Sequence, residues 1–176
     1  MAVAATIVRP SPTEYAPFYG GYVATVPDGD FLSLLEQQGR ETVAALATVP
    51  AGREDHRYAP GKWSIREVLG HVTDAERVFC YRALHFARAA DTPLPPFDEN
   101  AWAEISSAGR RPLAEQLKEF ASVRAATLSL FRGFNAEELA RSGVASNHPV
   151  SVRALAFIIA GHERHHVKIL REKYGV

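Results

Sequence analysis

Apolar side chains recur at alternating spacings of three and four residues along four stretches of the chain. This spacing places them on one side of a helix, so each stretch is predicted to form an amphipathic helix with one buried face. The predicted helices cover residues 30 to about 49, 64 to about 89, 113 to about 131, and 151 to about 174. No strand-like alternation of any length and no glycine-rich phosphate loop accompany them, which disfavours nucleotide-binding α/β folds. The pattern predicts an all-α four-helix bundle.

Residues that start or stop a helix mark the ends of these segments. Ser64 and Glu67 have the spacing of a capping box, in which each side chain accepts a hydrogen bond from an exposed backbone N–H at the helix start. Pro50 ends the first predicted helix, Ser151 is the predicted N-cap of the fourth, and Gly175 closes it.

The remaining segments connect or precede the bundle. Residues 1–29 carry four prolines and are predicted to form an irregular N-terminal arm over the core, with the bundle in residues 30–176. The proline-containing connection 91–112 can span up to roughly 66 Å, so the third helix can run parallel to the second and the bundle is predicted to be up-down-down-up. Phe97 and Trp102 in this connection are expected to cover the bundle end, with substrate contact as the alternative. Residues 143–149 are expected to be a loop.

Composition limits the classes of function. The chain has 176 residues, enough for one domain with a real core, and its 47% hydrophobic and 23% charged residues are ordinary for a globular protein. Twenty basic residues balance twenty acidic ones, so no net charge attracts nucleic acid or an anionic membrane. No apolar run reaches the length of a membrane span, and the N-terminus lacks the pattern of a signal peptide. We therefore expect a cytoplasmic protein that acts on a small molecule.

The fourth predicted helix carries two histidines on its buried face. Its apolar seam consists of Leu155, Ile159, His162, His166 and Ile169. His162 and His166 are separated by about 40° around the helix and roughly 6 Å along it, so both rings can reach one ion. The alternative is a pair of core histidines held by hydrogen bonds. A catalytic metal usually takes three protein ligands, so a third ligand must come from elsewhere.

The second predicted helix offers further candidates. His71 lies on or beside its apolar face, where it could also be a buried, hydrogen-bonded ring, and Asp74 follows one turn later as a possible support or extra ligand. Cys80 is the one cysteine; it lies about 180° around the helix from His71 and cannot share an ion with it. Because no thiolate cluster is possible, a metal site would be built from histidine with Asp or Glu, which suits zinc, nickel, iron or manganese.

Two motifs of the chain resemble the DinB/YfiT-like family. They are the run from Tyr58 to His71 (YAPGKWSIREVLGH), followed by Asp74 and Glu76, and the run His162-Glu163-Arg164-His165-His166. The resemblance covers about residues 30–174. It implies an up-down-down-up four-helix bundle, a divalent metal held by His71, His162 and His166, and a homodimer. Members of this family include metal-dependent hydrolases and thiol S-transferases that use bacillithiol, mycothiol or glutathione-like cofactors, and the family name does not imply DNA binding.

A metal site built from three histidines is expected to activate a nucleophile. A metal held by three histidines can provide hydroxide from water or thiolate from a low-molecular-weight thiol, which leads to hydrolysis or S-transfer. Glu163 and Asp74 are the candidate catalytic residues, as general bases or as partners that orient a ligand ring, with surface charge as the alternative. His165 is the alternative ligand to His166, which we prefer because it continues the apolar seam. Arg124, on the seam of the third helix, is expected to pair with a carboxylate rather than bind an anionic substrate group.

A second hypothesis comes from another class of protein. The chain could be a helical interaction module whose metal site is structural or vestigial. An exposed apolar face on the first or third predicted helix would favour it, as would a metal site without a solvent-accessible cavity.

Overall fold

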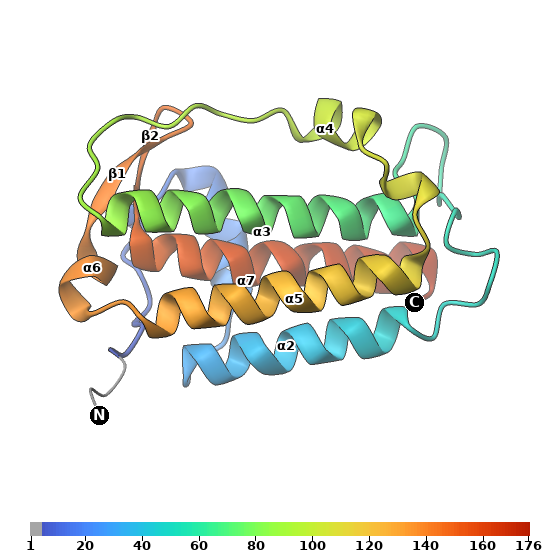
Figure 1. Cartoon of the computed structure of the whole chain (residues 1–176), viewed down its shortest axis with the longest axis horizontal. Helices are drawn as coiled ribbons and strands as arrows, with labels where there is room; N and C mark the ends of the chain where they lie inside the picture. Colours follow the sequence, from blue (N-terminus) through green and yellow to red (C-terminus); the bar gives the residue numbers. More distant parts are fainter. Residues whose placement is uncertain (1–4) are drawn as a thin grey trace.

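The computed structural model of the chain describes residues 5–176 and contains a bundle of four long helices (Figure 1). These are α2 (Phe31–Leu46), α3 (Ile65–Ala87), α5 (Leu113–Arg132) and α7 (Val152–Ile169). The shorter elements are α1 (Gly20–Thr25), α4 (Glu99–Ile105), α6 (Ala136–Ala140), the strands β1 (Ser142–Ala145) and β2 (His148–Ser151), three single 3₁₀ turns (Pro12–Glu14, Pro17–Tyr19 and Ala108–Arg110) and a π-helical turn (Leu170–Tyr174). The predicted all-α four-helix bundle is confirmed.

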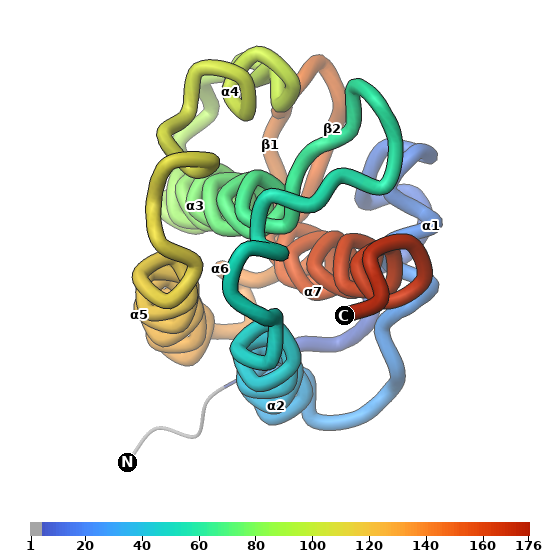
Figure 2. Tube along the Cα trace, turned by 90° about the vertical axis from the view of Figure 1, so that its right-hand side faces the viewer, coloured from blue at the N-terminus to red at the C-terminus, as the bar shows by residue number. Residues whose placement is uncertain are grey.

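The bundle has the predicted up-down-down-up connectivity. In Figure 1, α2 and α7 run in one direction, and α3 and α5 run in the other. The connection between α3 and α5 returns along the outside of α3, so that these two helices are parallel neighbours. The view along the bundle in Figure 2 shows α1 beside α7 and α4 outside α3. These two short helices therefore lie against the pair α3 and α7, on which the histidine motifs are located.

The helix ends follow the sequence signals. The hydroxyl of Ser64 accepts a hydrogen bond from the backbone N–H of Glu67, and the carboxylate of Glu67 accepts one from the backbone N–H of Ser64, which completes the predicted capping box. The hydroxyl of Ser151 accepts from the backbone N–H of Ala154 at 3.1 Å, and Gly175 takes the left-handed conformation (φ 69°) that ends the last turn.

The connection 91–112 is more ordered than its prolines suggested. It contains α4, whose N-terminus is capped by Asp98: one carboxylate oxygen accepts from the backbone N–H groups of Asn100 and Ala101, each at 3.0 Å. A helix of seven residues is too short to show a convincing periodicity. It is therefore absent from the sequence-based prediction.

Residues 143–149 form part of a hairpin, and the prediction of a loop there was wrong. Strands β1 and β2 pair antiparallel, with Ser146 and Asn147 at the turn, both at positive φ. Leu94 of the long connection adds backbone hydrogen bonds to Val144 and Ser146. Four-residue strands, one of which contains Pro149, are too short to reveal an alternating pattern.

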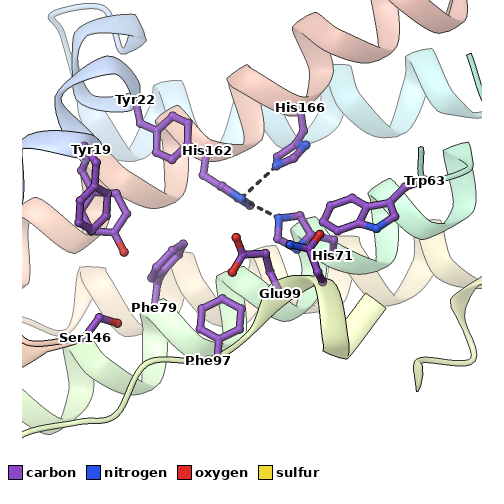
Figure 3. Close-up of a pocket in the computed structure, with 12 residues that line it drawn as sticks. Tyr19, Tyr22, Trp63, His71, Phe79, Phe97, Glu99, Ser146, His162 and His166 are labelled. Atoms are coloured by element: carbon purple, nitrogen blue, oxygen red, sulfur yellow. Dashed lines mark hydrogen bonds between the residues drawn. The ribbon is translucent and has the colours of Figure 1, made fainter. Parts of the chain in front are cut away.

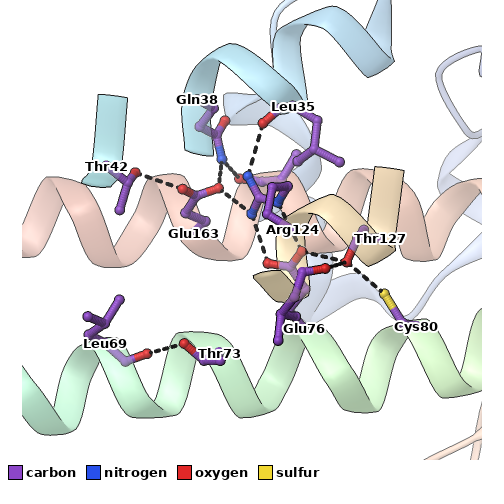
Figure 4. A network of polar contacts seen from close by, with 12 residues as sticks. Leu35, Gln38, Thr42, Leu69, Thr73, Glu76, Cys80, Arg124, Thr127 and Glu163 are labelled. Carbon is purple, nitrogen blue, oxygen red and sulfur yellow. Dashed lines mark hydrogen bonds and ion pairs between the residues drawn. The ribbon is translucent and has the colours of Figure 1, made fainter. Parts of the chain in front are cut away.

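A buried polar layer divides the bundle core into two apolar clusters. One cluster contains Phe31, Phe79, Phe131 and Leu155, and the other contains Leu46, Leu69, Leu117 and Leu170. Between them, each long helix contributes polar side chains, namely Gln38 and Thr42 from α2, Glu76 from α3, Arg124 and Thr127 from α5, and Glu163 from α7 (Figure 4). The guanidinium of Arg124 donates to Glu76 at 2.8 and 2.9 Å and to Glu163 at 2.7 Å, so the expected pairing of Arg124 with a carboxylate is confirmed.

The segment before α2 packs closely on α7. Glu14 accepts hydrogen bonds from Arg153 and Ser151 at the start of α7, and α1 lies along the middle of that helix. The backbone of Tyr22 comes so near Gly161 that a Cβ placed there would lie 2.2 Å from the Tyr22 carbonyl oxygen. The division of the chain at residue 29 stays a prediction. Within residues 5–176, every helix is too short or too polar to span a bilayer.

Candidate metal centre

Three histidine rings meet between α3 and α7 (Figure 3). Nε2 of His162 lies 3.0 Å from Nε2 of His71 and 3.1 Å from Nε2 of His166. Candidate ligand nitrogens of the three rings all lie within 4.8 Å of one another. The structure thus brings together the two histidines of α7 and the predicted third residue from α3.

The spacing of these nitrogens fits a divalent metal. Two nitrogens bound tetrahedrally to one ion at about 2.0–2.1 Å are roughly 3.3 Å apart, close to the two short separations found here. Three imidazoles suit zinc and the other first-row divalent metals, and leave coordination positions for water or substrate. His162 is buried and the other two rings are half-buried, so the site is protected but reachable.

Burial keeps the three imidazoles neutral, which is the form that binds metals. It lowers the pKa of His71 to about 4, although the nearby Glu99 carboxylate acts in the opposite direction. Burial, with His71 and His165 nearby, lowers the pKa of His166 to about 3. The pKa of His162 is also lowered well below its ordinary value, first by burial and then by the neighbouring histidines.

Aromatic rings hold the histidines in place. The Trp63 ring centroid lies 4.7 Å from that of His71 and 6.4 Å from that of His166. Tyr22 and Phe79 form T-shaped pairs with His162 at centroid separations of 5.5 and 5.9 Å. Trp63 immediately precedes the cap of α3, and its carbonyl oxygen accepts a hydrogen bond from the Tyr174 hydroxyl at 2.6 Å. The last turn of the chain therefore helps to fix the wall of the site.

A cavity of about 460 Å³ opens from the histidines. Its lining is mainly aromatic, and its polar groups outside the histidines are Glu99, Asn100, Ser146 and the tyrosine hydroxyls. In Figure 3 the Glu99 carboxylate points into the cavity on the side of His71 and His162. Phe97 also lines the cavity, whereas Trp102 is exposed and packs its ring on that of Phe97. The substrate-contact alternative therefore agrees with the position of Phe97.

The two carboxylates predicted as catalytic lie elsewhere. Glu163 is 1% exposed and accepts hydrogen bonds from Gln38, Thr42 and Arg124 in the polar layer, so it is not a surface charge. Asp74 lies on the outer side of α3, where it pairs with Arg77 at 3.2 Å. The structure does not bring either carboxylate to the histidine nitrogens, and a catalytic role for them stays a prediction without a supporting contact.

The remaining candidates also lie outside the cluster. His165 is exposed and its ring packs on Tyr22, which agrees with the preference for His166. Cys80 shares a 3.2 Å hydrogen bond with Thr127, away from the histidines, and burial raises its pKa to about 12. A thiolate from this residue is therefore not available at neutral pH.

Sequence reasoning missed the residues that complete the site from distant segments. Glu99 begins α4, and Tyr19 and Tyr22 belong to the arm. The only local signal was the N-cap residue Asp98 before Glu99, together with the unusual number of aromatics in the arm. Neither signal indicates which side of the bundle these segments cover.

The chain was compared with known proteins. The family profile described as the DinB superfamily matches residues 34–170. A protein of Oceanobacillus iheyensis named "putative metal-dependent hydrolase" is 30% identical over 112 residues, which are 62% of this chain and 64% of that protein. The chain thus spans less than two thirds of that relative. A protein of Bacillus mycoides with the same kind of name is 25% identical, covering 86% of this chain and 91% of the relative.

A solved structure shows the same fold. YfiT from Bacillus subtilis, described as "a probable metal-dependent hydrolase with an unusual four-helix bundle topology", matches with a TM-score of 0.73. The match covers 86% of this chain and 91% of YfiT at 18% sequence identity. With four helices in this order and a family profile that spans most of the bundle, the chain belongs to the DinB superfamily.

Proposed function

We propose that the chain is a metal-dependent enzyme in which His71, His162 and His166 bind one divalent metal and activate a small nucleophile for hydrolysis. The observation that supports this most directly is the meeting of three neutral imidazoles at the inner end of an open cavity. The names of the relatives from Oceanobacillus and Bacillus point to the same class of reaction.

A divalent metal in this site would act as a Lewis acid that makes hydroxide or thiolate available near neutral pH. The three histidines, whose Nε2 atoms converge, would hold it, and the packing of Trp63 and Tyr22 against their rings fixes the direction of these nitrogens. The carboxylate of Glu99, which points into the cavity, would accept the proton that the nucleophile gives up.

Thiol transfer is the second reaction that the same site supports. Because the thiol of Cys80 is bound to Thr127 outside the cavity, the thiol would come from solution as a small cofactor. A cavity of about 460 Å³ is large enough for a substrate or a cofactor of modest size. An activity test therefore has to show whether water or a thiol is the nucleophile.

The interaction-module hypothesis has less support. The histidines open into a cavity, and within the described chain the exposed large apolar side chains lie outside α2 and α5. Both features are the opposite of what that hypothesis expects.

The direct test is the metal content of the protein, measured by mass spectrometry after incubation with zinc, nickel or manganese. Wild type is expected to hold about one metal per chain, and His71→Ala, His162→Ala and His166→Ala are expected to lose it. His165→Ala is the matched control, since it removes an exposed histidine of the same helix and should keep the metal. Circular dichroism confirms that each variant is folded. Metal-free wild type, or variants that keep the metal, would contradict the proposal.

The second step is a comparison of nucleophiles with metal-loaded protein. Ester and amide substrates are tested for hydrolysis, and electrophilic substrates are tested with and without added small thiols. Product formation without thiol identifies a hydrolase, whereas formation that requires the thiol identifies a transferase. Turnover that survives in His166→Ala would exclude this site as its origin.

A further inference from the structure

A buried arginine lies behind the cavity wall on the side away from the metal centre. Arg82 is 3% exposed and lies on the same face of α3 as His71, eleven residues later, which corresponds to roughly 16 Å along the helix axis. Its guanidinium donates from Nη2 to the carbonyl oxygen of Pro95 at 2.9 Å and to the hydroxyl of Ser146 at 3.0 Å.

The surroundings of Arg82 belong to the cavity wall. The guanidinium carbon lies 6.0 Å from the ring centroid of Phe79 and 5.8 Å from that of Phe97. Burial lowers the pKa of Arg82, and the neighbouring Tyr19 acts in the opposite direction. Tyr19, the two phenylalanines and Ser146 all line the cavity. In Figure 3, Tyr19 and Ser146 lie at the opposite end of the pocket from His71 and Trp63. Arg82 is thus directly behind the far end of the cavity.

No carboxylate of residues 5–176 lies within ion-pair distance of Arg82. The other deeply buried arginine, Arg124, contacts two carboxylates, as a buried charge normally does. Both hydrogen bonds of Arg82 use Nη2, and the only fully buried side-chain polar atom of the described chain that lacks a hydrogen bond is Gln116 Oε1. The Nε and Nη1 groups of Arg82 therefore make no hydrogen bond with the described residues, and they are not fully buried.

We propose that Arg82 binds the anionic end of the substrate, so that the enzyme acts on elongated small acids whose reacting group lies at the three histidines. This inference rests on the proposed function for the assignment of the reacting end. The assignment of the anion-binding end rests on Arg82 and its neighbours alone. A ligand that spans the cavity would present an apolar middle to Phe79 and Phe97.

A carboxylate is the anion that this end of the cavity fits. Among the described residues no lysine or arginine lines the cavity, and Arg82, which donates to Ser146 of the lining, can neutralise a single negative charge. Its planar N–H groups match the two oxygens of a carboxylate, and the hydroxyls of Tyr19 and Ser146 can donate to the same group. A phosphate dianion would lack a second cation.

The test is a pair of probes that differ only at the distal end. Calorimetry measures the binding of 8-mercaptooctanoate and 8-mercaptooctanol to metal-loaded wild type. The acid is expected to bind about ten- to hundredfold more tightly, the usual gain for hydrogen bonds to a charged group in a desolvated site. Equal affinities in wild type would overturn the proposal, whatever the behaviour of the variants.

Variants separate anion binding from support of the cavity wall. Arg82→Gln is expected to abolish the preference for the acid, whereas Arg82→Lys should keep part of it. Arg77→Gln is the matched control, since it removes an exposed arginine of the same helix that pairs with Asp74 and Glu119 outside the cavity, and it should keep the full preference for the acid. If Arg82 is only structural, Arg82→Gln will weaken both probes equally, and an acid preference that persists in this variant also overturns the inference.

A measurement on metal-free protein distinguishes this inference from the proposed function. Octanoate and octanol are compared on chelator-treated protein, where a preference for the acid depends on Arg82 and not on metal. Failure of metal uptake overturns the proposed function, whereas absence of the acid preference in the metal-free protein overturns the proposed anion site.

Discussion

At the scale of single residues, the centre of the site is His162, which lies within 3.1 Å of two other imidazole nitrogens. One partner, His166, is four residues away on the same helix, and the other, His71, is 91 residues away on α3. The carboxylate beside this cluster belongs to Glu99, a residue of the long connection. Helices α3 and α7 thus contribute the imidazoles, and α4 contributes the carboxylate.

Glu99→Gln is predicted to lower turnover by about 10²- to 10⁴-fold, because it removes the proton acceptor next to the nucleophile. Metal content should stay at the wild-type value, since Glu99 is outside the group of three nitrogens. Steady-state kinetics with a substrate identified by the nucleophile comparison, together with mass spectrometry of the same preparation, checks both expectations.

Glu104→Gln is the control for this prediction. Glu104 is exposed on the same short helix and does not line the cavity, so its replacement should leave turnover unchanged. Equal loss of activity in both variants would indicate that α4 itself was disturbed, and unchanged turnover in Glu99→Gln would exclude it as the proton acceptor.

At the scale of elements, three consecutive residues of α7 contact three different parts of the molecule. Successive side chains point about 100° apart around a helix, so Gly161 faces α1, His162 faces the cavity and Glu163 faces the polar layer. The same rotation explains why Glu163 is adjacent to His162 in sequence and yet does not support its ring.

Gly161→Ala is predicted to destabilise the protein by about 1–3 kcal/mol, because the new Cβ would lie 2.2 Å from the Tyr22 carbonyl oxygen and push α1 away. The displacement should also loosen the wall of the metal centre, since Tyr22 packs on His162. Urea unfolding measures the stability change. Gly21→Ala, on the facing helix with open space around it, should be close to neutral, and equal stability of the two variants would contradict this contact.

The contact of the arm with α7 is predicted to depend on pH through Glu14. Burial raises the pKa of this carboxyl, but hydrogen bonds from Arg153, Ser11 and Ser151 outweigh it and lower the pKa to about 2. A depressed carboxyl pKa stabilises the folded state above the unfolded value of 4.5, and this contribution is lost as pH falls from 4.5 towards 2.

Glu14→Gln is therefore expected to lower the free energy of unfolding by about 1–2 kcal/mol at pH 7 and by progressively less below pH 4.5. Denaturant titrations of both proteins at several pH values measure the difference. Glu137→Gln, which removes an exposed ion pair with Arg141, should have little effect at any pH. A difference between wild type and Glu14→Gln that is constant with pH would contradict the assigned pKa.

At the scale of the whole molecule, the polar layer joins all four long helices at one level of the bundle. Arg124 contacts the carboxylates of Glu76 and Glu163 and the Leu35 carbonyl oxygen, which come from α3, α7 and α2. On α2, α5 and α7 the polar residues of this layer lie between the two apolar clusters, and on α3 Glu76 follows Ala75, the first residue of that helix in the cluster of Phe79. The layer therefore fixes the relative heights of the helices, including those that carry the histidines.

Arg124→Met is predicted to destabilise the fold by about 3–5 kcal/mol, because it leaves two carboxylates buried without their cation. Arg132 also lies on α5, and its exposed ion pair with Glu36 of α2 is lost in Arg132→Met. This variant should lower the free energy of unfolding by less than about 1 kcal/mol. Urea unfolding followed by circular dichroism compares the two. If Arg124→Met were no more costly than Arg132→Met, the layer would not stabilise the bundle as described.

Sequence reasoning predicted the parts of this protein that depend on local order. The four long helices, the caps at Ser64 and Ser151, and the pair His162 and His166 all follow from spacings within one segment. The helix α4 and the hairpin were missed, since each is too short for a periodic pattern and is held by contacts with other segments, such as those of Leu94. The surface-charge alternative for Glu163 was wrong because periodicity did not reveal the arginine of α5 opposite it.

The amino-acid sequence by itself determined the helices and the face of α7 on which two histidines lie, because helical periodicity is set by residues three and four positions apart. The resemblance to a known family assigned His71 as the third ligand. Only the tertiary structure decided that Glu99 and the tyrosines of the arm line the same cavity as the histidines and that Arg82 contacts Ser146 at its far end. Such meetings depend on how distant segments pack, and packing is a property of the folded chain that no local spacing encodes.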